Sequence, residues 1–98
     1  MDRLGMMEVF VLAVETGSFS AVGRRLGLGQ PTVSRLIAQL EERLGSRLLL
    51  RSTRGLAPTE AGEAYYRRAR EILAQVNEAD AMVQQCRAGL SGRLRVSA

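Results

Sequence analysis

Hydrophobic residues recur at every third or fourth position through the first part of the chain, a spacing typical of amphipathic helices. Gly17 is suited to end one helix and Ser18 to cap the next. The pattern therefore predicts two helices around this point, the first contributing to the core and the second being short. The buried face of the first consists of Leu4, Met7, Phe10, Val11 and Val14, and that of the second of Phe19, Val22 and Leu26.

A third helix is predicted after the segment Gly27–Gly29, in which two glycines allow a sharp turn, as a helix-turn-helix requires. It runs from Gln30 to Leu44, with Pro31 in the first turn, where a missing N–H costs nothing. When its residues are placed at about 100° apart, one side is apolar and is expected to face the core. This side consists of Val33, Leu36, Ile37, Leu40 and Leu44.

The opposite side of the third helix carries small or polar residues and one arginine, with no acid before Glu41. Small residues let a helix approach the major groove of DNA closely, and Arg, Gln, Ser and Thr side chains can bond base edges. The pattern therefore favours a surface that reads double-stranded DNA. Its centre consists of Pro31, Arg35 and Ala38, with Thr32 and Ser34 at its sides.

The stretch after the third helix predicts a two-stranded hairpin with a basic tip. A short apolar run from Arg47 to Arg51 is interrupted by Ser52–Gly55 and resumes at Leu56–Pro58. A plain surface loop is the alternative interpretation. Because the hairpin follows a helix suited to DNA, its arginine-bearing tip resembles the wing of a winged helix.

The last helix is predicted from Thr59 to about Leu90, since acidic residues in its first turns suit the helix dipole and no proline interrupts it. A seam of apolar or small residues follows it at alternate spacings of four and three. A helix of roughly 45 Å outruns a core this small, so the seam is expected to pair with a second copy of the chain. Packing against the first helix of the same chain is the alternative, and is expected near Tyr65. The seam consists of Tyr65, Ala69, Ile72, Val76, Ala79, Val83, Cys86 and Leu90.

The charge of the chain is concentrated in its middle. All 14 basic residues are arginine, and with 10 acids they give a net charge of +4 and a pI near 10.5. From Gly17 to Pro58 seven arginines face two acids, whereas from Thr59 to Ala98 six face five. A basic excess also occurs on solvated faces of ordinary proteins, but this distribution favours an anion-binding helix-turn-helix and hairpin.

Several function classes are disfavoured by the composition. The chain has no histidine, and Cys86 has no partner thiol, so we expect neither a metal site nor a cofactor nor enzymatic activity. No apolar run approaches the roughly 18 residues that a membrane span needs, and the N-terminus lacks the pattern of a signal peptide. We therefore expect a cytoplasmic protein without a membrane partner, whose 98 residues bury one modest core.

The segment from Gly17 to Tyr66 closely resembles the LysR-type transcriptional regulator family. The resemblance implies a mainly α fold, with a winged helix-turn-helix of three helices and a two-stranded β wing in residues 1–58. A long dimerisation linker helix follows in residues 59–90, and residues 91–98 would begin a two-lobed sensor domain that is otherwise missing. Four motifs carry the resemblance, namely Gly17–Ser20, Gln30–Arg35, Leu40–Gly45 and Thr59–Gly62.

The resemblance also implies partners and contacts. The expected partners are double-stranded DNA and a second copy of the chain, with antiparallel linker helices and a dimer or tetramer in the full-length protein. The expected DNA site is an interrupted inverted repeat with T near one end and A near the other, and a small-molecule inducer would bind only through the missing domain. A winged-helix interaction or dimerisation module without specific DNA binding is the alternative, since fold does not fix function. The implied base and phosphate contacts are Ser18, Ser20, Gln30, Pro31, Thr32, Ser34, Arg35, Arg51, Thr53 and Arg54.

Three glycines depart from the family pattern. Gly29 stands where the family usually has Ser or Thr as the N-cap of the third helix, a role that glycine can fill at little cost. Gly23 replaces a usual alanine and is expected to weaken the second helix. Gly55 replaces a frequent second wing arginine, which reduces the minor-groove contact that the resemblance implies.

Overall fold

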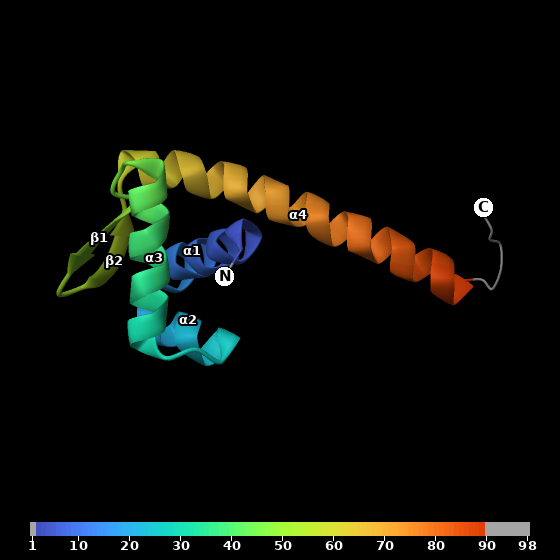
Figure 1. The fold of residues 1–98 in the computed structure, drawn as a ribbon, viewed down its shortest axis with the longest axis horizontal. Helices are drawn as coiled ribbons and strands as arrows, with labels where there is room; N and C mark the ends of the chain where they lie inside the picture. The colour runs from blue at the N-terminus through green and yellow to red at the C-terminus, as the bar shows by residue number, and fades with distance from the viewer. Residues whose placement is uncertain (1, 90–98) are drawn as a thin grey trace.

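The computed structural model describes residues 2–89, which form four helices and one two-stranded antiparallel sheet (Figure 1). The predicted mainly helical fold and the order of its elements are confirmed. Leu90 and residues 91–98, where the resemblance predicts the start of a sensor domain, lie outside the described residues. The elements are α1 (Arg3–Thr16), α2 (Phe19–Leu26), α3 (Gln30–Leu44), β1 (Leu49–Ser52), β2 (Gly55–Pro58) and α4 (Glu60–Gly89).

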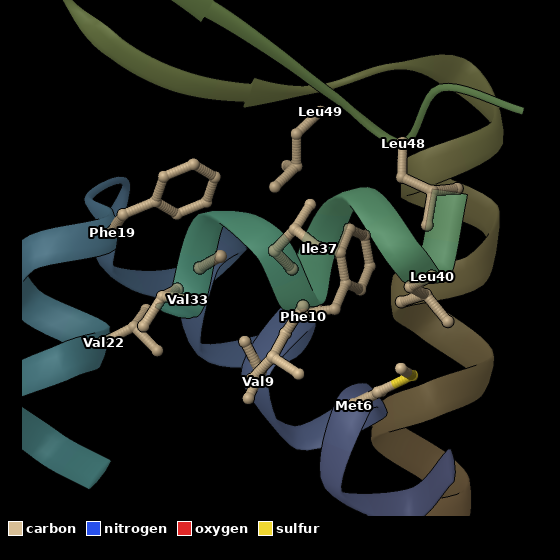
Figure 2. Close-up of a cluster of buried hydrophobic side chains, with 12 residues drawn as sticks. Met6, Val9, Phe10, Phe19, Val22, Val33, Ile37, Leu40, Leu48 and Leu49 are labelled. Carbon is tan, nitrogen blue, oxygen red and sulfur yellow. The ribbon is translucent and has the colours of Figure 1, made fainter. Parts of the chain in front are cut away.

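The first helix, α1, is buried on more than one side, because α2 and α3 pack against it from one direction and α4 from another. Met7 and Val11 form a small cluster with Ala69 of α4. The buried surface of α1 is therefore wider than the single face predicted from the sequence. The prediction is wrong at Leu4, which is 41% exposed. The residues of α1 that join the main core with α2, α3 and the hairpin are Met6, Val9, Phe10 and Ala13 (Figure 2).

The turn between α2 and α3 depends on the absence of a side chain at Gly23. Ser18 caps α2 by accepting a hydrogen bond from the Ala21 N–H, as predicted. A Cβ at Gly23 would lie 2.4 Å from the carbonyl oxygen of Leu28, whose N–H donates to the Gly23 carbonyl at 2.8 Å. Gly23 therefore does more than weaken α2, since it lets the turn fold back onto the helix. Gly29 is the N-cap of α3 and makes no side-chain capping bond.

The core face of α3 is confirmed except at its last residue. Val33, Leu36, Ile37 and Leu40 are buried, but Leu44 is 44% exposed. Leu44 is the final residue of the helix, beyond the core cluster, which on α3 ends at Leu40. The prediction for Leu44 is wrong because helical spacing gives the direction of a side chain and not the extent of the core beneath it.

The hairpin is confirmed and the plain-loop alternative is excluded. Leu49 pairs with Pro58 and Ser52 with Gly55, so only Thr53 and Arg54 form the turn. The interruption predicted over Ser52–Gly55 is therefore too long, and β1 begins at Leu49 rather than at Arg47. Gly55 has a φ of +117°, and a Cβ there would lie 2.9 Å from the carbonyl oxygen of Gly17. This close approach explains why Gly55 is a glycine.

The last helix, α4, starts beside the loop that joins α3 to β1 and then extends well beyond the other elements (Figure 1). The Thr59 hydroxyl donates to the Arg47 carbonyl at 2.7 Å and accepts from the Gly62 N–H at 3.0 Å. The longest dimension of the molecule is 54 Å. Within residues 2–89, no helix combines the length and apolarity needed to cross a membrane.

Candidate nucleic-acid interface

A hollow of about 420 Å³ opens between the start of α2, the start of α3 and the hairpin. Six of the ten residues expected to contact DNA line it, and Pro31, Thr32, Ser34 and Arg35 continue along α3 outside its lining. The hollow and the α3 face together form what we call the basic face of the domain. The six lining residues are Ser18, Ser20, Gln30, Arg51, Thr53 and Arg54.

The α3 part of the basic face is arranged as predicted. Pro31, Arg35 and Ala38 are exposed, whereas Thr32 and Ser34 are half-buried at its sides. Small neighbours therefore leave Arg35 as the prominent charged side chain on the first half of the helix. Such a surface can approach a duplex closely while the arginine reaches a base edge or a phosphate.

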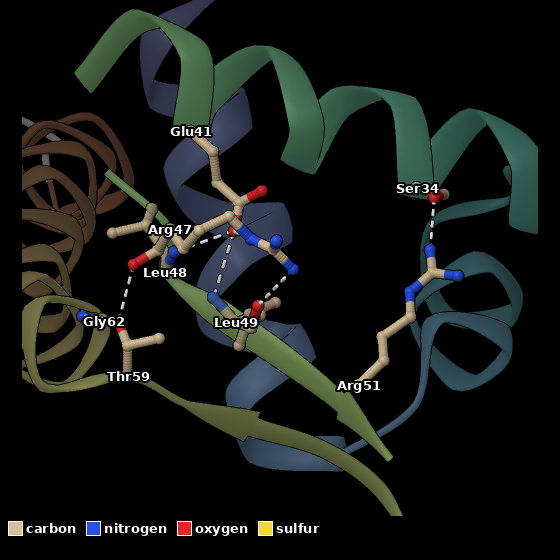
Figure 3. Close-up of polar contacts among 8 residues, drawn as sticks. All are labelled: Ser34, Glu41, Arg47, Leu48, Leu49, Arg51, Thr59 and Gly62. Atoms are coloured by element: carbon tan, nitrogen blue, oxygen red, sulfur yellow. Dashed lines mark hydrogen bonds and ion pairs between the residues drawn. The ribbon is translucent and has the colours of Figure 1, made fainter. Parts of the chain in front are cut away.

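Two side-chain contacts within the basic face join separate elements. The Ser20 hydroxyl of α2 donates to Gln30 Oε1 of α3 at 3.2 Å. The Arg51 guanidinium of β1 donates to the Ser34 hydroxyl of α3 (Figure 3). The same guanidinium lies 4.8 Å from the centre of the Phe19 ring. Two polar side chains of α3, Gln30 and Ser34, are thus bonded to α2 and to the hairpin in the free chain.

The tip of the hairpin is shaped by Ser52. Its hydroxyl accepts a hydrogen bond from the Arg54 N–H at 3.2 Å and donates to the Gly55 carbonyl at 3.4 Å. Among the described residues, no ion pair involves Arg35, Arg51 or Arg54. The charges of these three arginines are therefore not neutralised within residues 2–89 and are available to an anionic partner.

Glu41 fixes the position of the hairpin relative to α3, a role that the sequence analysis missed. Its carboxylate, 16% exposed, accepts hydrogen bonds from the backbone N–H groups of Leu48 and Leu49 at 2.8 and 3.1 Å (Figure 3). Arg47 Nε lies 3.7 Å from the same oxygen. The available signal was that Glu41 is the first acid on α3, after eleven residues without one. Phe19 and Ser52 were also missed, because their roles depend on tertiary contacts.

The predicted seam of α4 divides into two parts. Tyr65 packs edge-on against Phe10 with ring centres 5.5 Å apart, and Ala69 is wholly buried against α1. These two positions belong to the core of the chain itself, as the alternative interpretation expects near Tyr65, and Ala69 is closed to a partner. Beyond them Val76 is half-buried, and the exposed seam positions are Ile72, Ala79, Val83 and Cys86.

Polar contacts reinforce the packing of α4 on α1. The Tyr66 hydroxyl donates to the Glu15 carboxylate at 2.9 Å, and the Arg70 guanidinium lies 5.6 Å from the Tyr66 ring centre. Desolvation is the main cause that raises the pKa of Tyr66 above its usual value, and the hydrogen bond to Glu15 raises it further. Desolvation also raises the pKa of Tyr65, against the opposing effect of Arg3 and Arg43. Both phenols are therefore neutral near pH 7.

The described residues offer no metal centre, since no group of three or more His, Cys, Asp or Glu side chains is placed together within residues 2–89. The features that stand out are a turn between two helices, an exposed helix face and a basic hairpin beside it. This arrangement defines the winged helix-turn-helix class of proteins.

Comparison with known proteins places the chain within this class. Residues 4–63 match the family model described as bacterial regulatory helix-turn-helix protein, lysR family. An uncharacterised HTH-type transcriptional regulator of Haemophilus influenzae is 40% identical over 97 residues, which are 99% of this chain and 34% of the relative. The chain belongs to the LysR family. It spans about a third of the length of that relative.

Solved structures of two other proteins share the fold. One is a crystal structure of the BenM DNA-binding domain in complex with catB site 1 DNA. It is 35% identical to this chain and superimposes with a TM-score of 0.82, and the match covers 91% of this chain and 99% of that one. CbnR, described as a LysR family transcriptional regulator, is 32% identical with a TM-score of 0.78, covering 88% of this chain and 29% of that one. The long terminal helix is included in both alignments, because the five elements before it cannot account for such coverage.

Proposed function

We propose that this chain binds double-stranded DNA sequence-specifically as the DNA-binding part of a homodimeric bacterial transcription regulator. In this proposal α3 enters the major groove and the hairpin enters the adjacent minor groove. The observation that carries it is the basic face, where the exposed side of α3, which carries no acid in its first half, adjoins a hairpin whose arginines form no ion pair within residues 2–89. The DNA complex of the similar BenM domain supports the assignment.

The proposed contacts are those expected from the sequence. Gln30, Pro31, Thr32, Ser34 and Arg35 would meet base edges and phosphates in the major groove, with Ser18 and Ser20 close to the backbone. Arg51, Thr53 and Arg54 would supply the contacts of the hairpin, with Thr53 and Arg54 at its tip reaching the minor groove. No catalytic role, cofactor or membrane contact is part of the proposal, and the protein would act in the cytoplasm.

Dimerisation would use the part of the α4 seam that α1 leaves uncovered. Ile72 and Val83 are 39% and 64% exposed, and an apolar stripe of this kind is stabilised by burial against a second helix. A two-fold axis through antiparallel α4 helices would place two α3 helices on one interrupted inverted repeat. In a full-length protein, a sensor domain after α4 would respond to a small-molecule inducer, and dimers could assemble into tetramers.

Arg35→Ala tests the placement of α3. Arg35 is exposed on the basic face and can pair with guanine or clamp a phosphate, so the variant is expected to lose about 1–3 kcal/mol of specific binding. Selection of bound fragments from random duplexes first identifies the preferred site, and a gel-shift titration then measures the affinity. Arg87→Ala, which removes the same charge far from the basic face on α4, is the matched control. Unchanged affinity of Arg35→Ala would mean that another element enters the groove.

Arg54→Ala tests the placement of the hairpin. An arginine at its tip suits the negative potential of a narrow, A·T-rich minor groove. The variant is therefore expected to weaken binding most on sites with A·T-rich flanks. The measurement compares parent and variant on two duplexes that share the selected core and differ in the flanks. An equal loss on G·C-rich flanks would assign Arg54 a nonspecific phosphate contact instead.

A further inference from the structure

Arg51 is the one basic-face arginine whose side chain bonds two other elements. It lies on β1, donates to Ser34 on α3 and stacks over Phe19 at the start of α2. Its neighbour Arg54 instead lies in the two-residue turn of the hairpin. Two wing arginines only three positions apart are therefore in different surroundings.

Strand alternation explains why the Arg51 side chain, although exposed, is directed toward α2 and α3. Along β1, Leu49 is buried and Leu50 is exposed, and alternation along a strand turns Arg51 to the same side as Leu49. On that side lie the edge of the core and the half-buried Ser34. The guanidinium group, which lies at the surface, thus bridges the hairpin to α3 through Ser34 and to the start of α2 through Phe19.

We propose that Arg51 is a positioning residue that sets the hairpin relative to α3, so that Arg54 reaches the minor groove when α3 occupies the major groove. It acts through Phe19 and Ser34 rather than chiefly through DNA. The proposal rests on the proposed function for its consequence in DNA binding, but the placement of the hairpin can be measured in the free protein. A planar guanidinium stacks and donates in a fixed geometry that a lysine ammonium cannot reproduce.

Arg51→Lys separates positioning from simple charge. If Arg51 served only as a charge near a phosphate, lysine would retain most of the affinity and the salt slope. If Arg51 positions the hairpin, the variant loses affinity on the A·T-flanked duplex by a factor on the order of two to five, the range for an exposed cation–π contact. Arg54→Ala then costs less in the Arg51→Lys background than in the parent, whereas a pure phosphate contact predicts equal losses.

Phe19→Leu provides a second route to the same effect, at a residue that is not among the proposed DNA contacts. Phe19 is 7% exposed, so its replacement alters the stacking surface of Arg51 without removing a DNA contact. We expect it to reduce the effect of Arg54→Ala as Arg51→Lys does. Phe10→Leu is the matched control, because it makes the same substitution in the core at a ring that packs against Tyr65 rather than Arg51. It should leave the effect of Arg54→Ala unchanged.

The deciding experiment measures the hairpin directly in the free chain. Spin labels are attached at Thr53→Cys in the turn and Ala38→Cys on α3, in a Cys86→Ser background, and labelled protein is diluted with unlabelled protein to suppress signals between copies. We expect one narrow distance distribution for the parent and a broadened or displaced one for Arg51→Lys and Phe19→Leu. Identical distributions in all three, with unaltered circular dichroism, would overturn the positioning role. Failure of the parent to bind any duplex specifically would instead overturn the proposed function and leave this readout valid.

Discussion

Val83→Asp is expected to convert a dimer into a folded monomer. Val83 lies on the outer part of α4 and is 64% exposed in the single chain, so an aspartate there stays solvated in the monomer. In the proposed dimer the carboxylate would be buried without a partner, at a cost of several kcal/mol. Val76 is a less suitable position for the test, because it is half-buried within the chain itself and a charge there would also penalise the monomer.

Light scattering at micromolar concentration measures the outcome. Ala81→Asp is the matched control, since it adds the same charge to α4. Ala81 is exposed and lies about 200° around the helix from Val83. The control should remain a dimer, and Val83→Asp should bind an inverted repeat no better than a half-site. An intact Val83→Asp dimer, or a monomeric parent, would contradict the role assigned to the seam.

Gly62→Ala is expected to destabilise the domain, although helix propensity alone predicts the opposite. Alanine favours a helix interior over glycine by about 0.5–1 kcal/mol. A Cβ at Gly62, however, would lie 2.0 Å from the carbonyl oxygen of Leu48, and Leu48 also accepts a hydrogen bond from the Thr59 N–H at 3.0 Å. Backbone must therefore move, and overpacking of this kind costs typically about 1–3 kcal/mol or more.

Chemical denaturation of parent and variant at one protein concentration measures this loss, because the proposed dimerisation would make stability depend on concentration. Gly29→Ala is the control, since its Cβ would meet only Pro31 Cδ at 3.7 Å and its φ is −73°. The control should lose up to about 1 kcal/mol, because alanine is a poorer N-cap than glycine, so the loss at Gly62 beyond that of the control reports the close approach to Leu48. A Gly62→Ala variant as stable as its parent would show that α4 does not start where the structure places it.

Helix boundaries in this chain are predictable because local chemistry sets them. Gly17, Gly27 and Gly45 adopt left-handed φ values of +70 to +72° at the three helix ends, and Ser18 caps α2 through its own side chain. Each of these effects acts within a few residues, so the sequence alone reveals it. The extent of burial does not behave in this way. Leu44 lies in register with the core face yet is 44% exposed, because the core cluster ends on α3 at Leu40.

The candidate site was predictable in its residues but only partly in its organisation. The polar side of α3 follows from helical spacing, and the basic hairpin tip follows from composition. The contacts of Arg51 with Phe19 and Ser34, and the hold of Glu41 on the start of the hairpin, join residues distant in sequence. The same is true of the close approaches at Gly23, Gly55 and Gly62. Such features depend on how elements meet, which residue spacing does not specify.

The central claim, sequence-specific duplex binding through the basic face, is tested most directly by comparing affinities across salt concentrations. The parent chain is titrated with its selected duplex and with a scrambled duplex of equal length between about 50 and 200 mM salt. The account predicts at least about 10³-fold tighter binding to the selected duplex and a steep decline of both affinities with salt, because phosphate contacts release counterions. Equal affinity for the two duplexes, or binding that is insensitive to salt, would contradict the account and favour a protein-interaction module.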